Sequence, residues 1–385
     1  LFDTFDNSET ETFTQELNLN VERDSMSLVF GGFYMDDETS RHTHFDNPQL
    51  ILGFPAPSQF DFKHLKMNTE SKAYFADGTF DLSDTTRLSL GLRKTTDEFT
   101  SKQDNFISVL VPTPVIAAQT CLREVVTEYS STTSRAVLQH DLSEGSNVYA
   151  SVSEGYKAGG YATYECAEAY NPEEVTSLEF GFKGSISEST SLNASIFRYD
   201  YSDFQVLQVI GLQTVTRNAG DATVNGLEIE AVSEINDSLS VTTALTLLDA
   251  TYGAFANANG VQPELGVQQL EGNYLTNAPK VSLNLGLNYF QNIESGGSLT
   301  YRANASYKSE IYFSEFNEFS QSAYTIVDLN VIWESADETL RSRFFIKNLT
   351  DEDYISGYIS SATGGGRFGQ WGTPRVYGVE VSRNF

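Results

Sequence analysis

The sequence predicts an all-β fold, a transmembrane antiparallel β-barrel, and three observations lead to this class. Apolar and polar residues alternate in segments from one end of the 385-residue chain to the other, without sustained helical periodicity. Short and long connections between these segments also alternate. The composition is rich in aromatic residues that favour strands, with 20 Tyr and 26 Phe.

About fifteen strands are predicted, each bounded by turn-forming residues. The alternation is clearest where Leu283, Leu285 and Leu287 are interleaved with Asn284 and Gly286. Such a strand has one apolar and one polar face. In chain order the predicted strands are Phe13–Val21, Ser27–Met35, Ser71–Leu82, Arg87–Phe99, Ser134–Leu142, Asn147–Ala158, Val175–Ile186, Ser191–Leu207, Val215–Ile235, Leu239–Phe255, Lys280–Phe290, Ser298–Phe313, Tyr324–Glu334, Leu340–Ile355 and Arg375–Phe385.

The connection lengths favour a membrane barrel over a soluble sandwich. Tight turns such as Ser143–Gly145 and Asn236–Ser238 join every second pair of predicted strands, and long connections such as Asp36–Glu70 and Thr100–Thr133 fall between them. Outer-membrane barrels have short periplasmic turns at one rim and long extracellular loops at the other. The first and last predicted strands run in the same direction, so an even-stranded barrel needs an odd number of further strands to close, with a strand count that is wrong by one as the alternative.

The charge and the apolar runs exclude several classes of protein. The formal net charge is -28, which argues against a nucleic-acid partner because nucleic acids select basic surfaces. No run of 18 apolar residues exists, so no transmembrane helix is predicted.

The sequence contains no catalytic constellation, so we predict neither an enzyme nor a bound cofactor. The four histidines do not have zinc-ligand spacing with cysteines. His42 and His44 lie in a predicted outer loop beside Asp46, where a solvated loop is favoured over a surface metal site. The glycine run Gly364–Gly366 neither directly follows a strand nor opens a helix, which favours loop flexibility over nucleotide binding.

Cys121 and Cys166 are the only cysteines, and both fall in predicted long loops on the same side. These two loops are separated by one short hairpin, so they are expected to be neighbours around a barrel rim. In an oxidising exterior the two residues are predicted to form a disulfide, with two free thiols as the alternative.

Five motifs resemble TonB-dependent outer-membrane receptors. The most specific is Phe344–Tyr354, which reads Phe-Phe-Ile-Lys-Asn-Leu-Thr-Asp-Glu-Asp-Tyr and is similar to the signature near the end of these barrels. Tyr149–Tyr161, Glu174–Lys183, Asn218–Glu230 and Phe13–Leu19 resemble other strands of the family. The motifs occur in the family's order and span essentially the whole chain, so residues 1–385 are interpreted as one barrel domain.

The resemblance implies a 22-stranded barrel filled by an N-terminal plug that carries a TonB-binding box. Nothing in the sequence resembles the plug or the box, and the fifteen predicted strands fall short of 22. The chain is therefore interpreted as a barrel portion that is incomplete at its N-terminus and lacks the plug, with a complete smaller barrel as the alternative. Phe385 resembles the terminal aromatic residue that the barrel-assembly machinery recognises.

The resemblance also implies a function in the outer membrane of a Gram-negative bacterium. We expect an active transporter for a bulky nutrient, an iron–siderophore complex first, with sugars, cobalamin and haem left open. The implied partners are TonB, the barrel-assembly machinery, the lipid bilayer with its lipopolysaccharide, and a small-molecule chelate. A passive porin-like channel and a surface adhesive β protein are the alternatives.

Ligand contacts in such receptors are expected from aromatic and arginine side chains of the outer loops, although packing of the loops is an equally good role for any single ring. Charged residues on the polar strand faces, such as Arg302, Arg343 and Glu230, are expected to face the lumen. The candidate ligand-binding residues are Tyr161, Tyr164, Tyr312, Phe316, Tyr354, Arg367, Phe368 and Trp371.

Overall fold

The computed structural model describes residues 3–46, 58–109, 116–161, 169–210, 213–259, 262–294, 296–361 and 366–384. Within them, fifteen strands form one antiparallel sheet in chain order, which confirms the predicted number and order of strands. The strands are β1 (Asp3–Arg23), β2 (Met26–Asp46), β3 (Ser58–Ser83), β4 (Thr86–Val109), β5 (Ile116–Ser143), β6 (Ser146–Lys157), β9 (Glu173–Ser187), β10 (Thr190–Ser202), β13 (Ala222–Asn236), β14 (Leu239–Tyr252), β17 (Val281–Ile293), β18 (Gly297–Lys308), β21 (Tyr324–Glu334), β22 (Leu340–Lys347) and β25 (Val376–Arg383).

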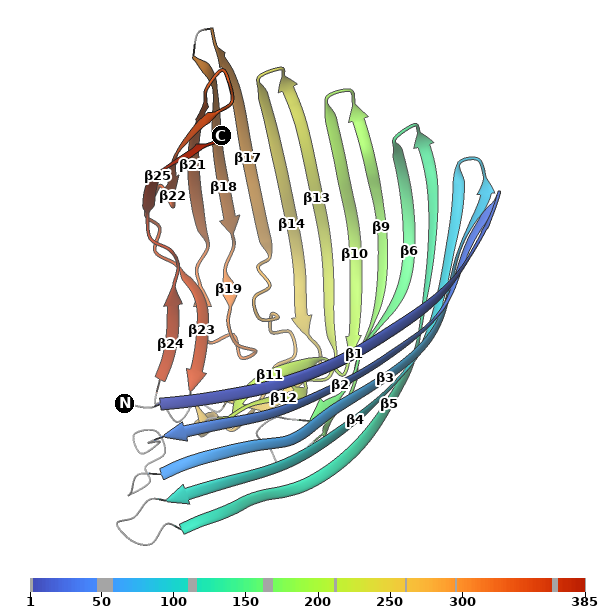
Figure 1. The fold of residues 1–385 in the computed structure, drawn as a ribbon, viewed down its shortest axis with the longest axis vertical. Coiled ribbons are helices and arrows are strands. Elements are labelled where there is room, and N and C mark those ends of the chain that lie inside the picture. The colour runs from blue at the N-terminus through green and yellow to red at the C-terminus, as the bar shows by residue number, and fades with distance from the viewer. Residues whose placement is uncertain are drawn as a thin grey trace.

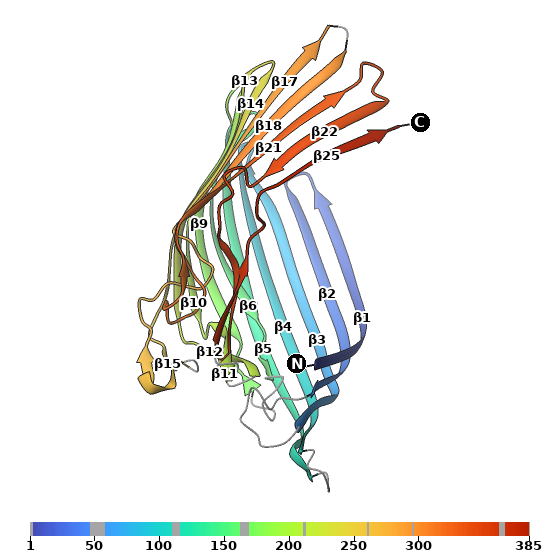
Figure 2. The same cartoon turned by 90° about the vertical axis from the view of Figure 1, so that its left-hand side faces the viewer.

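The sheet curls into an open trough with two different rims (Figure 1). Tight turns occupy the upper rim in this view, which we call the turn rim, and the longer connections leave the opposite loop rim. Figure 2 shows the trough from its side, with β1 and β25 as the two ends of the sheet. Because all neighbouring strands are antiparallel, β1 and β25 run in the same direction.

Among the described residues, the connections between strands of the main sheet contain five small hairpins and one short helix. They are short because the chain leaves the main sheet and returns to it within each connection. The hairpins pair β7 (Gly160–Tyr161) with β8 (Ala169–Tyr170), β11 (Gln205–Ile210) with β12 (Gln213–Asn218), β15 (Ala256–Ala258) with β16 (Val267–Gln269), β19 (Ile311–Tyr312) with β20 (Ser320–Gln321), and β23 (Ile355–Ser361) with β24 (Gly366–Trp371). The 3-10 helix η1 spans Pro263–Leu265.

The main sheet has one apolar and one polar face, as the alternation predicts. Large hydrophobic side chains stay exposed on the apolar face across the sheet, including Leu17, Phe180, Leu285 and Val379, at 69%, 54%, 39% and 71% exposure. An exposed apolar band of this width is typical of a surface that contacts lipid.

None of the described residues belongs to a helix that is long and apolar enough to cross a membrane.

Aromatic rings on the polar face fill space left by glycines on the neighbouring strand. Phe197 of β10 pairs directly with Gly226 of β13, and Phe345 of β22 pairs with Gly378 of β25. A Cβ atom on either glycine would overlap the ring. The absent side chain therefore lets the ring lie flat across the neighbouring strand, which fixes the register of the two pairs.

The sequence-based prediction of long loops between the first strands was wrong. Most of Asp36–Glu70 and Thr100–Thr133 is strand, because β2 to β5 continue far beyond the apolar band. The five strands β1 to β5 are 21 to 28 residues long. Thr, Ser and charged residues dominate the added length, and they pair across strands as well as apolar residues do.

Several later strands are shorter than predicted. The segment Ser191–Leu207 is not one strand, because β10 ends at Ser202 and β11 begins at Gln205. Likewise β22 ends at Lys347 and does not continue to Ile355. Asp203 and Asn348 adopt left-handed backbone angles, with φ of 52° and 50°, so each turns the chain out of the ladder.

Candidate functional site

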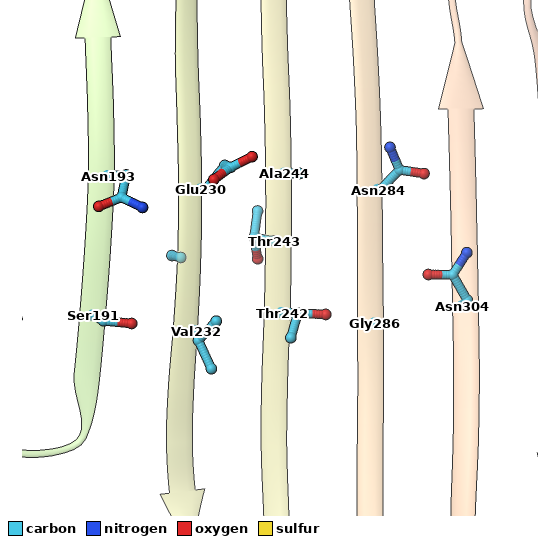
Figure 3. Close-up of a pocket in the computed structure, with 11 residues that line it drawn as sticks. Ser191, Asn193, Glu230, Val232, Thr242, Thr243, Ala244, Asn284, Gly286 and Asn304 are labelled. Carbon is cyan, nitrogen blue, oxygen red and sulfur yellow. The ribbon is translucent and has the colours of Figure 1, made fainter. Parts of the chain in front are cut away.

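Five neighbouring strands carry a polar patch on one face of the sheet (Figure 3). Asn193, Glu230 and Asn284 lie in one row across β10, β13 and β17, with the small Ala244 of β14 between the last two. A shallow depression of about 240 Å³ lies over this patch, next to Gly286. Within the described part of the chain, these three polar side chains have no hydrogen-bond partner, so they are available to another molecule or to water.

Charged side chains continue the polar face towards β25. Arg302 donates from Nε to Asn288 Oδ1 at 3.2 Å, and Arg343 donates from Nη2 to Asn330 Oδ1 at 2.7 Å. Arg343 also lies 3.5 Å from Glu380. The arginines thus point along the polar face, as predicted, and each is oriented by an amide of the preceding strand.

A buried apolar cluster lies at the loop-rim ends of β10, β13 and β14. Tyr252, Phe255 and Leu270 are at most 7% exposed in this cluster. Phe204 meets Tyr252 edge-on with ring centroids 6.1 Å apart, and Tyr252 lies 5.8 Å from Phe255. The first contact is edge-to-face and the second is tilted, and an edge-to-face ring pair at such a distance adds to the stabilisation from burial. We call this cluster, with the connections 253–280 and 309–323 that pack on it, the loop layer.

Asparagine and glutamate side chains connect the two parts of the loop layer. Asn317 accepts from the backbone N–H of Tyr274 at 2.7 Å and donates to its carbonyl oxygen at 2.9 Å. Asn257 donates to Glu315 Oε1 at 3.1 Å, and Asn273 donates to the Glu315 carbonyl at 2.9 Å. These bonds fix connection 309–323 against connection 253–280.

Burial raises the pKa of two groups in the loop layer. Burial raises the pKa of Tyr252 to about 12, with the Glu315 carboxylate as the next cause. Burial also raises the pKa of the Glu315 carboxyl, and the nearby Glu318 acts in the same direction. The hydrogen bond from Asn257 opposes the shift at Glu315. No described group of three or more His, Cys, Asp or Glu residues is placed to hold a metal ion.

Comparison with protein families identifies the fold. A family model described as TonB dependent receptor-like, beta-barrel, matches residues 2–349. The chain belongs to this family. Its members are outer-membrane receptors and transporters of Gram-negative bacteria, not enzymes. The apolar face of the sheet is therefore its lipid-facing side, and the polar face lines the lumen of a transmembrane barrel. No curated protein matches the sequence.

Solved structures of TonB-dependent receptors share this architecture. The ferric yersiniabactin uptake receptor FyuA from Yersinia pestis matches with a TM-score of 0.80 and 19% identity, over 100% of this chain and 55% of its own. The siderophore receptor PiuA from Acinetobacter baumannii matches with 0.69 and 18%, over 98% and 56%. The copper transporter OprC matches with 0.72 and 15%, over 99% and 58%. The chain thus spans little more than half the length of these relatives.

The TonB-dependent receptor fold places the predicted ligand-binding aromatics in separate parts of the loop rim. Phe316 packs against the buried cluster, and Tyr312 stacks on Tyr274 with ring centroids 5.8 Å apart. Tyr354 stacks on Tyr324 at 4.7 Å. The structure therefore gives these three rings packing contacts within the loops.

The other candidate ligand-binding residues do not belong to these packing contacts. The Tyr161 hydroxyl is hydrogen-bonded to the hydroxyl of Thr127 on β5. Trp371 is 69% exposed at the end of β24, which makes it the most accessible of the described candidate rings. The side chains of Tyr164, Arg367 and Phe368 lie outside the described residues, and so does Phe385. A role of any of these residues in ligand binding stays a prediction.

Two segments expected in loops are on strands. His42 and His44 lie on β2, with their rings 6.4 Å apart, so the predicted outer loop at this position was wrong. Cys121 lies on β5 and is 5% exposed. It takes part in a disulfide. Cys166 lies outside the described residues, and its pairing with Cys121 stays a prediction.

The sequence analysis missed the centre of the loop layer. Tyr252 and Phe255 were assigned to the end of a strand, and Glu315 and Asn317 were given no role. The available signal was the composition of 253–280 and 309–323, where aromatic residues occur among Asn and Gly. That composition is unusual for solvated loops, and it indicates connections with a core of their own.

Proposed function

We propose that this chain forms most of the barrel of an outer-membrane active transporter that takes up a bulky nutrient, first of all an iron–siderophore complex, with energy delivered through TonB. The match of the TonB-dependent receptor model to residues 2–349 carries this proposal. FyuA and PiuA are described as uptake and siderophore receptors, which supports a chelate as the substrate class.

The loop layer supports a receptor more than a passive channel. A simple pore needs an open mouth, whereas this rim holds a cluster of buried rings and cross-linked connections beside the lumen. Exposed aromatic surface such as Trp371 suits a planar, aromatic chelate, because ring stacking contributes affinity beyond burial. The polar patch around Glu230 then offers hydrogen-bonding groups further down the lumen.

Uptake of radiolabelled ferric siderophores by cells that carry the native gene tests this function. We expect accumulation that disappears in a strain without TonB and after collapse of the proton-motive force. Uptake that persists without TonB would favour the passive channel, and surface retention without uptake would favour an adhesive protein. A Trp371→Ala variant tests the aromatic contact, and we expect a weaker apparent affinity for the chelate with unchanged amounts of protein in the membrane.

A further inference from the structure

The lipid-facing surface of β2 to β6 contains a depression of about 640 Å³. Its lining is mainly apolar, with Phe30, Phe80, Leu90 and Leu92 among the larger side chains, and it also includes Asp77, Ser134 and Arg135. Leu90 and Leu92 are 45% and 56% exposed, so no other part of the described chain covers them. The depression is therefore open to whatever surrounds the barrel.

The depression arises from a regular alternation of large and small residues across the strands. Leu28, Gly78, Leu90, Ala136 and Val152 follow one another in register from β2 to β6. The small residues of β3 and β5 leave grooves on either side of the leucine ridge of β4. On β3 the next residue on this face is again small, Ala76. The groove thus runs along the strand, which is the shape that an extended acyl chain fills.

Two lysines lie at the loop-rim end of these grooves. Along β3 the lipid-facing side chains change from Ala76 to Tyr74 and then to Lys72, and along β4 Leu92 is followed by Lys94. Tyr74 is 72% exposed, and both lysine side chains are exposed. Lys94 donates to Ser130 Oγ at 3.1 Å, and Lys72 forms an ion pair with Glu70. Towards the loop rim, the apolar groove is therefore followed by an aromatic ring and then by cations. A lipid has the same order, with its acyl tail, its interfacial region and its headgroup.

A row of carboxylates limits how far a headgroup can extend towards the loop rim. Asp36, Glu70, Glu98 and Glu128 face one another in register across β2 to β5, one step beyond Lys72. A phosphate placed beyond the lysines, closer to the loop rim, would lie against this row of carboxylates and be repelled by it. The lysines and the carboxylates together define the position along the strands at which an anionic group is stable.

We propose that this surface binds a phosphorylated, multiply acylated lipid of the outer leaflet, with an acyl chain in the groove over Gly78 and Ala76 and a phosphate at Lys72 and Lys94. The proposal rests on the proposed outer-membrane location and is independent of transport. Lipid A, the acylated anchor of lipopolysaccharide, has the required phosphates and chains. The lipid completes the apolar surface that the small residues leave open.

Native mass spectrometry of the detergent-solubilised protein with added bisphosphorylated lipid A tests whether Lys72 and Lys94 bind the phosphate. We expect the double variant Lys72→Gln/Lys94→Gln to bind lipid A about tenfold more weakly than the wild type, because each basic residue near a membrane surface contributes measurably to binding of anionic lipid. The matched control is Lys66→Gln/Lys102→Gln on the same two strands, whose lysines pair with Glu38 and Glu124. The control should bind like the wild type. Equal loss in both variants, or equal binding of dephosphorylated lipid A, overturns the proposal.

A second variant tests the groove. Ala136→Leu should fill the space between Leu90 and Val152. Fewer lipid A molecules should then stay bound when the complex is collisionally activated in the mass spectrometer. The control Ala194→Leu, on the lipid-facing side of β10, should not have this effect. Unchanged retention in Ala136→Leu contradicts the groove. Fractionation of the cells that produce the protein distinguishes the two proposals. Absence of the protein from the outer membrane would refute the location, whereas presence there without binding of lipid A would refute only the lipid site.

Discussion

The loop rim of the barrel is built in two different ways. One part consists of the long strands β1 to β5, and the other is the loop layer at the loop-rim ends of β10, β13 and β14. In the first region the sheet itself continues, with strands of 21 to 28 residues. In the second region the strands are 13 to 15 residues long. The chain leaves the ladder at Asp203 after β10, and it returns through Gly220 before β13 and Asn277 before β17, all three with positive φ. One region extends the wall, and the other folds a small core beside the lumen.

The two regions gain their stability from different interactions. The extended wall is held by ladder hydrogen bonds and by cross-strand polar pairs such as Thr10 with Thr39 at 2.9 Å. The loop layer is held by buried rings and by side chains that bond to backbone groups, such as Asn317 with Tyr274. Loss of one pair in a ladder leaves the neighbouring pairs intact, whereas loss of a buried ring leaves a cavity. The loop layer should therefore be far more sensitive to single substitutions.

The largest expected effect is in the loop layer. Phe255→Ala removes a ring that is 7% exposed, and truncation of a buried aromatic residue costs about 3–5 kcal/mol. We expect the amides of 253–280 to lose hydrogen-exchange protection by a corresponding amount, with the main sheet unaffected. Tyr74→Ala is the control on the long strand β3, because Tyr74 is 72% exposed. Comparable losses in the two variants would contradict the proposed difference between the regions.

Within the membrane the two regions should behave alike. Leu92 of β4 and Leu285 of β17, the strand that follows connection 253–280, belong to the same lipid-facing band, at 56% and 39% exposure. Replacing either by arginine should cost about 2–4 kcal/mol near the bilayer midplane. The free energy of unfolding in lipid vesicles, from urea titration, measures this cost. Asn284→Arg, one residue away on the lumen-lining face, should be mild, and an equal cost at Asn284 would refute the assignment of the two faces.

The sequence predicted the sheet well because the lipid-facing band imposes a period of two on every strand. Leu283, Leu285 and Leu287 carry that signal wherever the strand crosses lipid. Beyond the band the signal disappears, since both faces of a wall in water accept Thr, Ser and charged residues. The extensions of β2 to β5 were therefore assigned to loops, although they are strands.

The candidate site was only partly predictable, because its contacts join residues far apart in the chain. Phe316 and Tyr312 were recognised as loop aromatics, but their roles in packing depend on partners in another connection. Asn317 and Tyr274 are separated by 43 positions. No local pattern marks such a pair, whereas left-handed positions such as Asn348 are at least of a residue type that tolerates the conformation.

A smaller effect should distinguish the loop layer by its dependence on pH. Burial raises the pKa of Glu315 in the folded layer above its value in an open loop, so the layer gains stability when this carboxyl is protonated. That stabilisation is present at low pH and is lost as the pH rises through the raised pKa. We expect stronger hydrogen-exchange protection of 309–323 at a pH below the ordinary carboxyl value of 4.5 than at neutral pH, after correction for intrinsic exchange. In Glu315→Gln the pH dependence should vanish, and its persistence would assign it to another group.

The smallest effect is expected in the wall formed by β1 to β5, from an ion pair on its lumen-lining face that spans three strands at the level of the lipid-facing band. Arg135 of β5 donates from Nε and Nη2 to the two carboxylate oxygens of Asp77 on β3, each at 2.8 Å. The pair passes over Gly91 of β4, where a Cβ atom would lie 2.5 Å from the carboxylate. The side chains are 49% and 33% exposed, and exposed pairs contribute about 0.2–1 kcal/mol. A double-mutant cycle of Arg135→Gln and Asp77→Asn, read from urea unfolding, should give a coupling energy in that range. A coupling several times larger would mean that the wall, like the loop layer, depends on individual side chains, and the contrast between the two regions would have to be abandoned.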